Sequence, residues 1–207
     1  CRDLSEFRAG DAVIHHYSIG SPVLERFAGA ACRKILMYHN ITPPEYFRPY
    51  DAGVTRQLET ARGFLAEIAR KVDAVWAVSA FNASELRSLG IPRVEVFPLL
   101  FDPRACDRPD DPSVAGRFAA PLTTFLTVSR IAPNKRIEHA IRAFDWYVKG
   151  INPFSRLIIV GSGRSCPRYF HALQMLVGDL DTPNICFEGF AAAEGLPTYY
   201  RNADVFL

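Results

Sequence analysis

The stretch TFLTVSRIAPNKRIEHAIRAFDWYVKGINPFSRLIIVGSG, residues 124–163, decides the fold. It opens with a short apolar run at residues 124–128 that is typical of a β-strand. Apolar residues then recur at spacings of three and four, which marks one face of a helix: Ile137, Ile141, Phe144 and Val148. The continuous apolar run at residues 157–160 is typical of a strand that is covered on both faces. Together these features predict a strand–helix–strand unit of a parallel sheet.

The same alternation extends in both directions from this stretch. Short apolar runs that predict strands stand at residues 11–17, 33–39, 73–79, 94–99, 185–187 and 204–207. The segment 101–121 breaks the rhythm with four prolines and many charged residues. We therefore expect a partial N-terminal Rossmann-like domain over 1–100, an interdomain linker over 101–121 and a partial C-terminal Rossmann-like domain over 122–207.

Composition narrows the class of protein. The 207 residues are 49% hydrophobic, and 24 Lys and Arg balance 22 Asp and Glu. This balance argues against a nucleic-acid partner or a polybasic membrane anchor. The five cysteines form no CxxC pair, which argues against a disulfide framework or a zinc site and favours a cytoplasmic protein. No apolar run approaches the roughly 18 residues of a membrane span.

Two cations flank the turn between the predicted strand at residues 124–128 and the helix that follows. An Arg130 side chain can grip phosphate oxygens with two hydrogen bonds, and Lys135 supplies a compact positive charge. The start of a helix adds free N–H groups. The pattern suits a diphosphate, although a solvated basic turn would have the same sequence.

Two further turns follow predicted strands. Gly161-Ser162-Gly163 is a tight turn that either lets backbone approach a ligand or is simply structural. As a dinucleotide fingerprint it is imperfect, because Cys166 stands where a third small residue belongs. His39 opens a proline-rich turn, where its imidazole could bind a polar substrate or tie down its own loop.

Other chemistry-bearing residues are interpreted as structural. His15 and His16 alternate faces of their strand, so at most one of them reaches a site, and packing is the favoured role for both. Asp179-Leu180-Asp181 mimics a metal-binding DxD motif but follows a helix, and we interpret it as a turn. No metal site is predicted.

Several strings resemble retaining glycosyltransferases of family 4. In the C-terminal half they are VSRIAPNKRIEHAIRAF, LIIVGSG, ICFEGF and LPTYYRNADVFL. In the N-terminal half HYSIGSP and YHNITPPEYF resemble donor-facing and acceptor-facing loops of bacterial members. The resemblance implies an α/β protein of the GT-B type, with two Rossmann-like parallel-sheet domains that face each other across a cleft and a nucleotide-sugar held mainly by the second.

The resemblance also implies roles for individual residues. His39 matches the catalytic-site histidine that approaches the transferred sugar, and Arg130 and Lys135 match the pair that binds the donor diphosphate. The nucleotide-binding positions are Gly161, Gly163, Glu188, Gly189 and Phe190. The acceptor-side loops contain Ser18, Gly20, Asn40 and Thr42.

Three departures from the family pattern affect these expectations. Arg136 stands where the family usually has glycine. The family's glycine-rich loop and its E-x7-E glutamate pair are not found in these 207 residues. We therefore expect an interior fragment with both domains incomplete, and little or no turnover by this chain alone.

The activity implied by the resemblance is transfer of a hexose from a UDP- or GDP-sugar to a hydroxyl acceptor, with retention and without a metal or cofactor. The acceptor would be a saccharide or lipid-linked saccharide in polysaccharide biosynthesis, with peripheral contact at the cytoplasmic face of the inner membrane. Alternatives are a non-catalytic nucleotide-binding module and another GT-B enzyme such as a phosphorylase or epimerase. An NAD-dependent oxidoreductase is disfavoured by the imperfect glycine turn.

Overall fold

The computed structural model describes residues 7–207, and the chain divides into two compact units at Phe101/Asp102. The first unit contains β1 (Ala12–Tyr17), α1 (Val23–Ala28), β2 (Arg33–Tyr38), η2 (Pro44–Tyr46), α2 (Ala52–Arg70), β3 (Ala74–Ala77), α3 (Ala80–Ser88) and β4 (Glu95–Val96). The second contains η3 (Pro103–Cys106), α4 (Pro112–Ala115), η4 (Gly116–Phe118), β5 (Thr123–Val128), η5 (Pro133–Lys135), α5 (Ile137–Gly150), β6 (Ser155–Val160), η6 (Gly163–Ser165), α6 (Pro167–Leu180), β7 (Ile185–Gly189), α7 (Leu196–Asn202) and β8 (Val205–Phe206).

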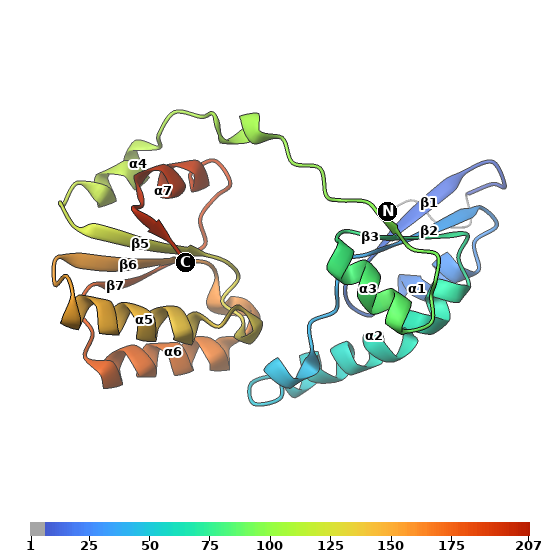
Figure 1. Ribbon diagram of the computed structural model, residues 1–207, viewed down its shortest axis with the longest axis horizontal. Helices are drawn as coiled ribbons and strands as arrows, with labels where there is room; N and C mark the ends of the chain where they lie inside the picture. Colours follow the sequence, from blue (N-terminus) through green and yellow to red (C-terminus); the bar gives the residue numbers. More distant parts are fainter. Residues whose placement is uncertain (1–6) are drawn as a thin grey trace. The chain divides into compact units, whose positions relative to one another are not determined.

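The first unit is a four-stranded parallel sheet in the order β1-β2-β3-β4, with its three main helices on one face (Figure 1). Three strand side chains of the same face reach these helices. The His15 ring lies 5.0 Å from the ring of Phe27 in α1. The Tyr17 hydroxyl donates to a backbone carbonyl of α2, and the Tyr38 hydroxyl donates to a carboxylate of α3. A chain that moves to the next strand through right-handed crossovers always places its helices on the same side.

Helix α2 follows the sequence pattern closely. The Asp51 side chain accepts a hydrogen bond from the Val54 N–H at 2.9 Å and caps the first turn. Apolar residues that recur at spacings of three and four along α2 are buried: Leu58, Ala61, Leu65 and Ile68. Burial of this face against the sheet stabilises the helix more than its intrinsic propensity does.

The second unit is also a four-stranded parallel sheet, but its order is β7-β6-β5-β8 and helices cover both faces (Figure 1). Phe125 packs edge-on against Phe144 of α5. Leu126, the next residue of the same strand, belongs to a core on the opposite face that includes Val114 of α4 and Tyr199 of α7. The change of direction between β7 and β8 places α7 opposite α5 and α6.

Most of the segment predicted as a linker, 101–121, is part of the second unit. Val114 is buried, the Asp111 N–H donates to the Thr198 hydroxyl at 2.9 Å, and Arg201 pairs with Asp110 at 2.5 Å. The sequence of this segment is typical of a connection because α4 and η4, two of its three short helical turns, bury little besides Val114.

Two Rossmann-like parallel-sheet units confirm the predicted α/β fold class. Among residues 7–207, no helix is both long enough and apolar enough to cross a membrane. Within the same described residues, no group of three or more His, Cys, Asp or Glu side chains is placed to hold a metal ion.

Candidate functional site

The carboxyl ends of β5, β6 and β7 meet through backbone contacts at Gly161. Its N–H donates to the Gly189 carbonyl at 2.7 Å. A β-carbon at Gly161 would lie 1.8 Å from the Ser129 carbonyl oxygen, and its φ of 157° is one that residues with side chains rarely adopt. Glycine is therefore required here because three strand ends approach closely.

The other two predicted nucleotide-binding glycines also have local structural reasons. A β-carbon at Gly163 would lie 2.5 Å from the ring of Phe170, so this glycine lets η6 pack against α6. Gly189 has a positive φ of 77°, and the register of β6 and β7 shifts beside it. Gly161 and Gly163 therefore mark close packing at the ends of these strands, whereas a β-carbon at Gly189 would meet nothing within 4 Å. A ligand role for these glycines stays a prediction.

The two cations predicted to bind a diphosphate follow β5. Arg130 and Lys135 are both exposed, whereas the residues between them include a buried apolar anchor, Ile131. Within residues 7–207, neither Arg130 nor Lys135 forms an ion pair. An anchored backbone with two unpaired cations at its ends suits an anionic ligand.

Arg136 is the N-cap residue of α5 and has a left-handed backbone, φ 52° and ψ 39°. The Ile137 N–H donates to the Tyr169 hydroxyl at 3.0 Å, and that hydroxyl donates to the Glu138 carboxylate. Burial, and then the Glu138 carboxylate, raise the pKa of Tyr169. Tyr169 thus uses one of the first N–H groups of α5, so the cations rather than this N–H are available to a ligand.

Glu188 and Phe190, both predicted to bind the nucleotide, differ in their surroundings. The Glu188 side chain is 8% exposed and pairs with Arg117 of η4. It also accepts a hydrogen bond from the Tyr199 hydroxyl at 3.3 Å. Phe190 is 81% exposed. The Glu188 carboxylate is therefore held by this chain's own residues, whereas Phe190 presents a free aromatic surface.

In the first unit, His39 follows β2 and its ring meets that of His16. The Nδ1 atom of His16 lies 2.7 Å from the Nε2 atom of His39, and the ring centroids are 4.8 Å apart. Partial burial, and then the charge of His16, lower the pKa of His39. The sequence interpretation gave His16 a packing role and so missed this partner.

The proline-rich loop after His39 is fixed by other side chains. The Ile41 N–H donates to the Tyr38 hydroxyl at 3.2 Å, and the Ile41 carbonyl accepts from Arg62. Arg62 pairs with Glu85 at 2.5 Å, and the Tyr38 hydroxyl donates to Glu85 at 2.6 Å. Burial, and then Glu85, raise the pKa of Tyr38. Because this cluster holds the loop, the His39 ring is left to interact with His16.

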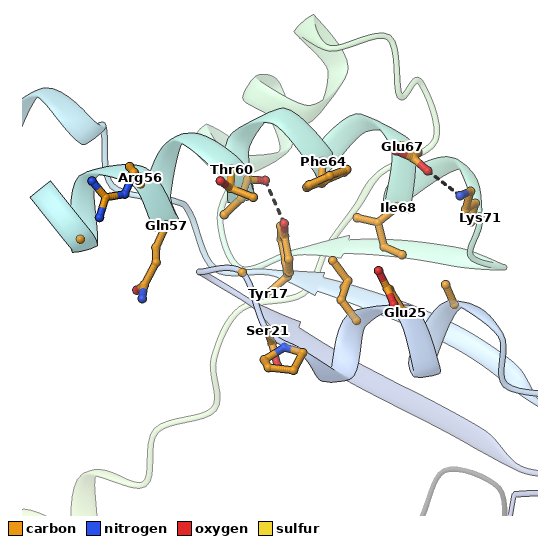
Figure 2. Close-up of a pocket in the computed structure, with 16 residues that line it drawn as sticks. Tyr17, Ser21, Glu25, Arg56, Gln57, Thr60, Phe64, Glu67, Ile68 and Lys71 are labelled. Atoms are coloured by element: carbon orange, nitrogen blue, oxygen red, sulfur yellow. Dashed lines mark hydrogen bonds and ion pairs between the residues drawn. The ribbon is translucent and has the colours of Figure 1, made fainter.

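A groove of about 940 Å³ lies beside the predicted acceptor loop, between α1 and α2. Figure 2 shows Arg56 and Gln57 at one end of α2 and the paired Glu67 and Lys71 at the other. Its lining residues are Tyr17, Gly20, Ser21, Pro22, Leu24, Glu25, Ala28, Gly53, Arg56, Gln57, Thr60, Ala61, Phe64, Glu67, Ile68 and Lys71. Of the predicted acceptor-side residues, Gly20 lines this groove, and Ser18, Asn40 and Thr42 do not.

No family model and no curated protein matches the sequence. Solved structures match the fold. HepE of Anabaena in complex with UDP is 18% identical, with a TM-score of 0.65 over 95% of this chain and 52% of that one. Sucrose-phosphate synthase of Thermosynechococcus elongatus is 15% identical, with a TM-score of 0.65 over 89% and 55%. The α,α-trehalose 6-phosphate synthase of Burkholderia multivorans is 13% identical, with a TM-score of 0.67 over 97% and 51%.

The chain therefore spans about half the length of these structural neighbours. At such low identity the likeness establishes the fold, which is that of the GT-B glycosyltransferases: two α/β units with Rossmann-like parallel sheets.

Proposed function

We propose that this chain acts in glycosyl transfer, moving a hexose from a UDP- or GDP-sugar to a hydroxyl acceptor with retention and without a metal. One observation carries the proposal: on a GT-B fold, Arg130 and Lys135 are exposed and form no ion pair among residues 7–207. They follow the carboxyl end of β5, the edge at which open α/β sheets bind ligands.

Departure of a nucleoside diphosphate leaves negative charge on the phosphate oxygens in the transition state. A fixed positive charge beside those oxygens stabilises the transition state more than the ground state, and so lowers the barrier. Arg130 can form two parallel hydrogen bonds to the phosphates, and Lys135 supplies a point charge. At Gly189, beside these strand ends, a β-carbon would meet nothing within 4 Å, and we assign this open position to the nucleotide.

We assign His39 of the first unit to orientation of the hexose, because its ring is neutral at physiological pH when its pKa is lowered. We assign the groove beside Gly20 to the acceptor. Its walls combine apolar surface from Leu24 and Phe64 with polar groups such as Gln57, which suits a saccharide or a saccharide joined to a lipid.

The test is a panel of UDP, GDP, ADP and NADH in thermal-shift and calorimetric titrations. It compares the wild-type chain with an Arg130→Ala/Lys135→Ala double variant. A ligand that binds only the folded protein stabilises it in proportion to its saturation. Loss of two charge-assisted contacts, each about 1.5–3 kcal/mol, should weaken diphosphate binding by roughly 100-fold or more.

The matched control is Arg142→Ala/Lys149→Ala, which removes the same charge further along α5 and should leave the affinity near that of the wild type. Stabilisation by NADH alone would favour an oxidoreductase. Equal binding of diphosphates by the wild type and the Arg130/Lys135 variant would show that these two residues do not form the donor site.

A further inference from the structure

The His16–His39 contact constrains the protons of both rings. A separation of 2.7 Å between His16 Nδ1 and His39 Nε2 is hydrogen-bond distance, so one nitrogen carries the hydrogen and the other offers its lone pair. Two N–H groups would repel at this distance, and so would two lone pairs. The tautomer of one ring therefore dictates the tautomer of the other.

Two arrangements satisfy this constraint for neutral rings. If His39 donates, both rings carry their hydrogen on Nε2, the tautomer that neutral histidine prefers in water. If His16 donates, both rings must carry it on Nδ1, the less favoured form. The first arrangement satisfies both intrinsic preferences at once, whereas the second violates both.

The neighbouring groups do not reverse this choice. His16 lies on the sheet face opposite His15 and Tyr17, both of which reach the helices. Among residues 7–207, no Asp, Glu, Lys or Arg forms a hydrogen bond or ion pair with either ring. The charge of His16 acts on the pKa of His39 and also on that of His15, the neighbouring residue of β1.

We propose that His16 is a positioning residue that accepts the Nε2 hydrogen of His39 and thereby turns the Nδ1 lone pair of His39 outward, as an acceptor for a sugar hydroxyl. This inference rests on the proposed function and adds to it a direction for the hydrogen bond. Hydroxyl groups can donate to such a lone pair, so His39 selects a correctly placed hydroxyl.

Acid should abolish this arrangement. A proton added to His39 occupies Nδ1 directly. A proton added to His16 occupies the nitrogen that accepted, so His39 must move its own hydrogen to Nδ1. Either event converts the outward nitrogen of His39 from acceptor to donor. Partial burial lowers the pKa of His39 and so preserves the acceptor form at neutral pH.

The experiment is a long-range ¹H–¹⁵N correlation spectrum of the ligand-free chain with ¹⁵N-labelled histidine. At pH 7.5 we expect His39 to show one fixed tautomer, with hydrogen on Nε2 and a bare Nδ1. His16→Asp keeps an acceptor, so it should keep this tautomer and raise the pKa of His39. His16→Phe removes the acceptor, so the His39 signals should move toward an average of both tautomers. His15→Phe, on the opposite face of β1, is the control and should leave His39 unchanged.

A second measurement compares binding of the nucleoside diphosphate with binding of its hexose conjugate. His16→Phe should weaken binding of the hexose conjugate by roughly 5-fold, which corresponds to the loss of one hydrogen bond of about 1 kcal/mol. Binding of the nucleoside diphosphate should be unaffected. A His39 ring with hydrogen on Nδ1 in the wild type, or no response to His16→Phe, would overturn the proposal. The spectra need no ligand, so their outcome is separate from that of the Arg130/Lys135 test.

Discussion

The carboxyl ends of the strands are built differently in the two sheets, and we call this end of each sheet its carboxyl edge. In the second unit the edge is backbone: Gly161 sits against Ser129 and Gly189 with no space for a side chain. In the first unit the edge is side chains, with the loop after β2 held by Tyr38, Arg62 and Glu85. Where the strand ends are closely packed backbone, the charged groups that an anion can reach include the exposed Arg130 and Lys135 after β5. A side-chain edge instead offers directional groups that distinguish small hydroxyl-bearing ligands.

The largest expected effect is at Gly161, where the comparison predicts no tolerance for a side chain. Gly161→Ala places a β-carbon 1.8 Å from the Ser129 carbonyl oxygen, so β5 or β6 must shift. We expect a loss of about 3–5 kcal/mol in the free energy of unfolding of the second unit. Urea unfolding monitored by Trp146 in a Trp76→Phe background reports on this unit, because each unit has one tryptophan.

The control is Gly178→Ala in α6, where a β-carbon meets nothing within 4 Å. Removing a helical glycine should stabilise by up to about 1 kcal/mol. If Gly161→Ala were as stable as this control, the strand ends would be less closely packed than described, and the distinction between the two edges would fail.

An intermediate effect is expected at Glu85, the centre of the side-chain edge. Glu85→Ala leaves the Tyr38 hydroxyl and the Arg62 guanidinium without their shared carboxylate. Loss of a partly buried charged hydrogen-bond partner should cost about 2 kcal/mol in the free energy of unfolding of the first unit. Trp76 fluorescence in a Trp146→Phe background follows that unit.

The matched control for Glu85 is Glu59→Ala. Glu59 forms an ion pair with Arg48 in which both side chains are about half exposed, at 45% and 60%. Such a pair contributes roughly 0–1 kcal/mol, so the control should change little. Equal effects of the two substitutions would mean that the Tyr38–Arg62–Glu85 cluster does not fix the edge of the first sheet.

The sequence predicted the strands and helix faces because their signals are local. The spacing of Ile137, Ile141, Phe144 and Val148 predicted the buried face of α5, and all four residues are buried. The glycines at 161 and 163 were likewise recognised as a tight turn. Their exact demand for glycine comes from Ser129 and Phe170, which are positioned by the fold and not by neighbouring sequence.

What the sequence did not predict depends on residues far apart in the chain. Glu188 contacts Arg117, and Tyr38 contacts Glu85; 71 and 47 positions separate these partners. No periodicity encodes such pairs. His16 could have been recognised: in the parallel pairing of β1 and β2 it lies opposite Met37, and His39 is two residues further on the same face. The proximity of His16 and His39 follows from the register of β1 against β2, not from the pattern of apolar residues in either strand.

The smallest expected effect is at Arg136, the N-cap residue of α5, which carries a side chain although its backbone conformation favours glycine. Arg136 has a φ of 52°, which costs a residue with a β-carbon about 1 kcal/mol. Glycine and alanine both remove the Arg136 side chain and its ion pair with Glu138, so a comparison of the two variants isolates the backbone contribution. The free energy of unfolding of the second unit should therefore be about 0.5–1 kcal/mol higher for Arg136→Gly than for Arg136→Ala.

Arg136→Ala separates backbone strain from the loss of the side chain. Alanine removes the guanidinium but keeps the β-carbon, so it retains the strain and should be the less stable of the two variants. The free energy of unfolding is measured by Trp146 fluorescence during urea unfolding. If it is higher with glycine than with alanine, Arg136 is, like Gly161, a position whose backbone conformation favours glycine. Equal stability of the two variants would instead show that the start of α5 accommodates the left-handed residue without strain, because contacts such as that of Tyr169 with Ile137 hold it in place.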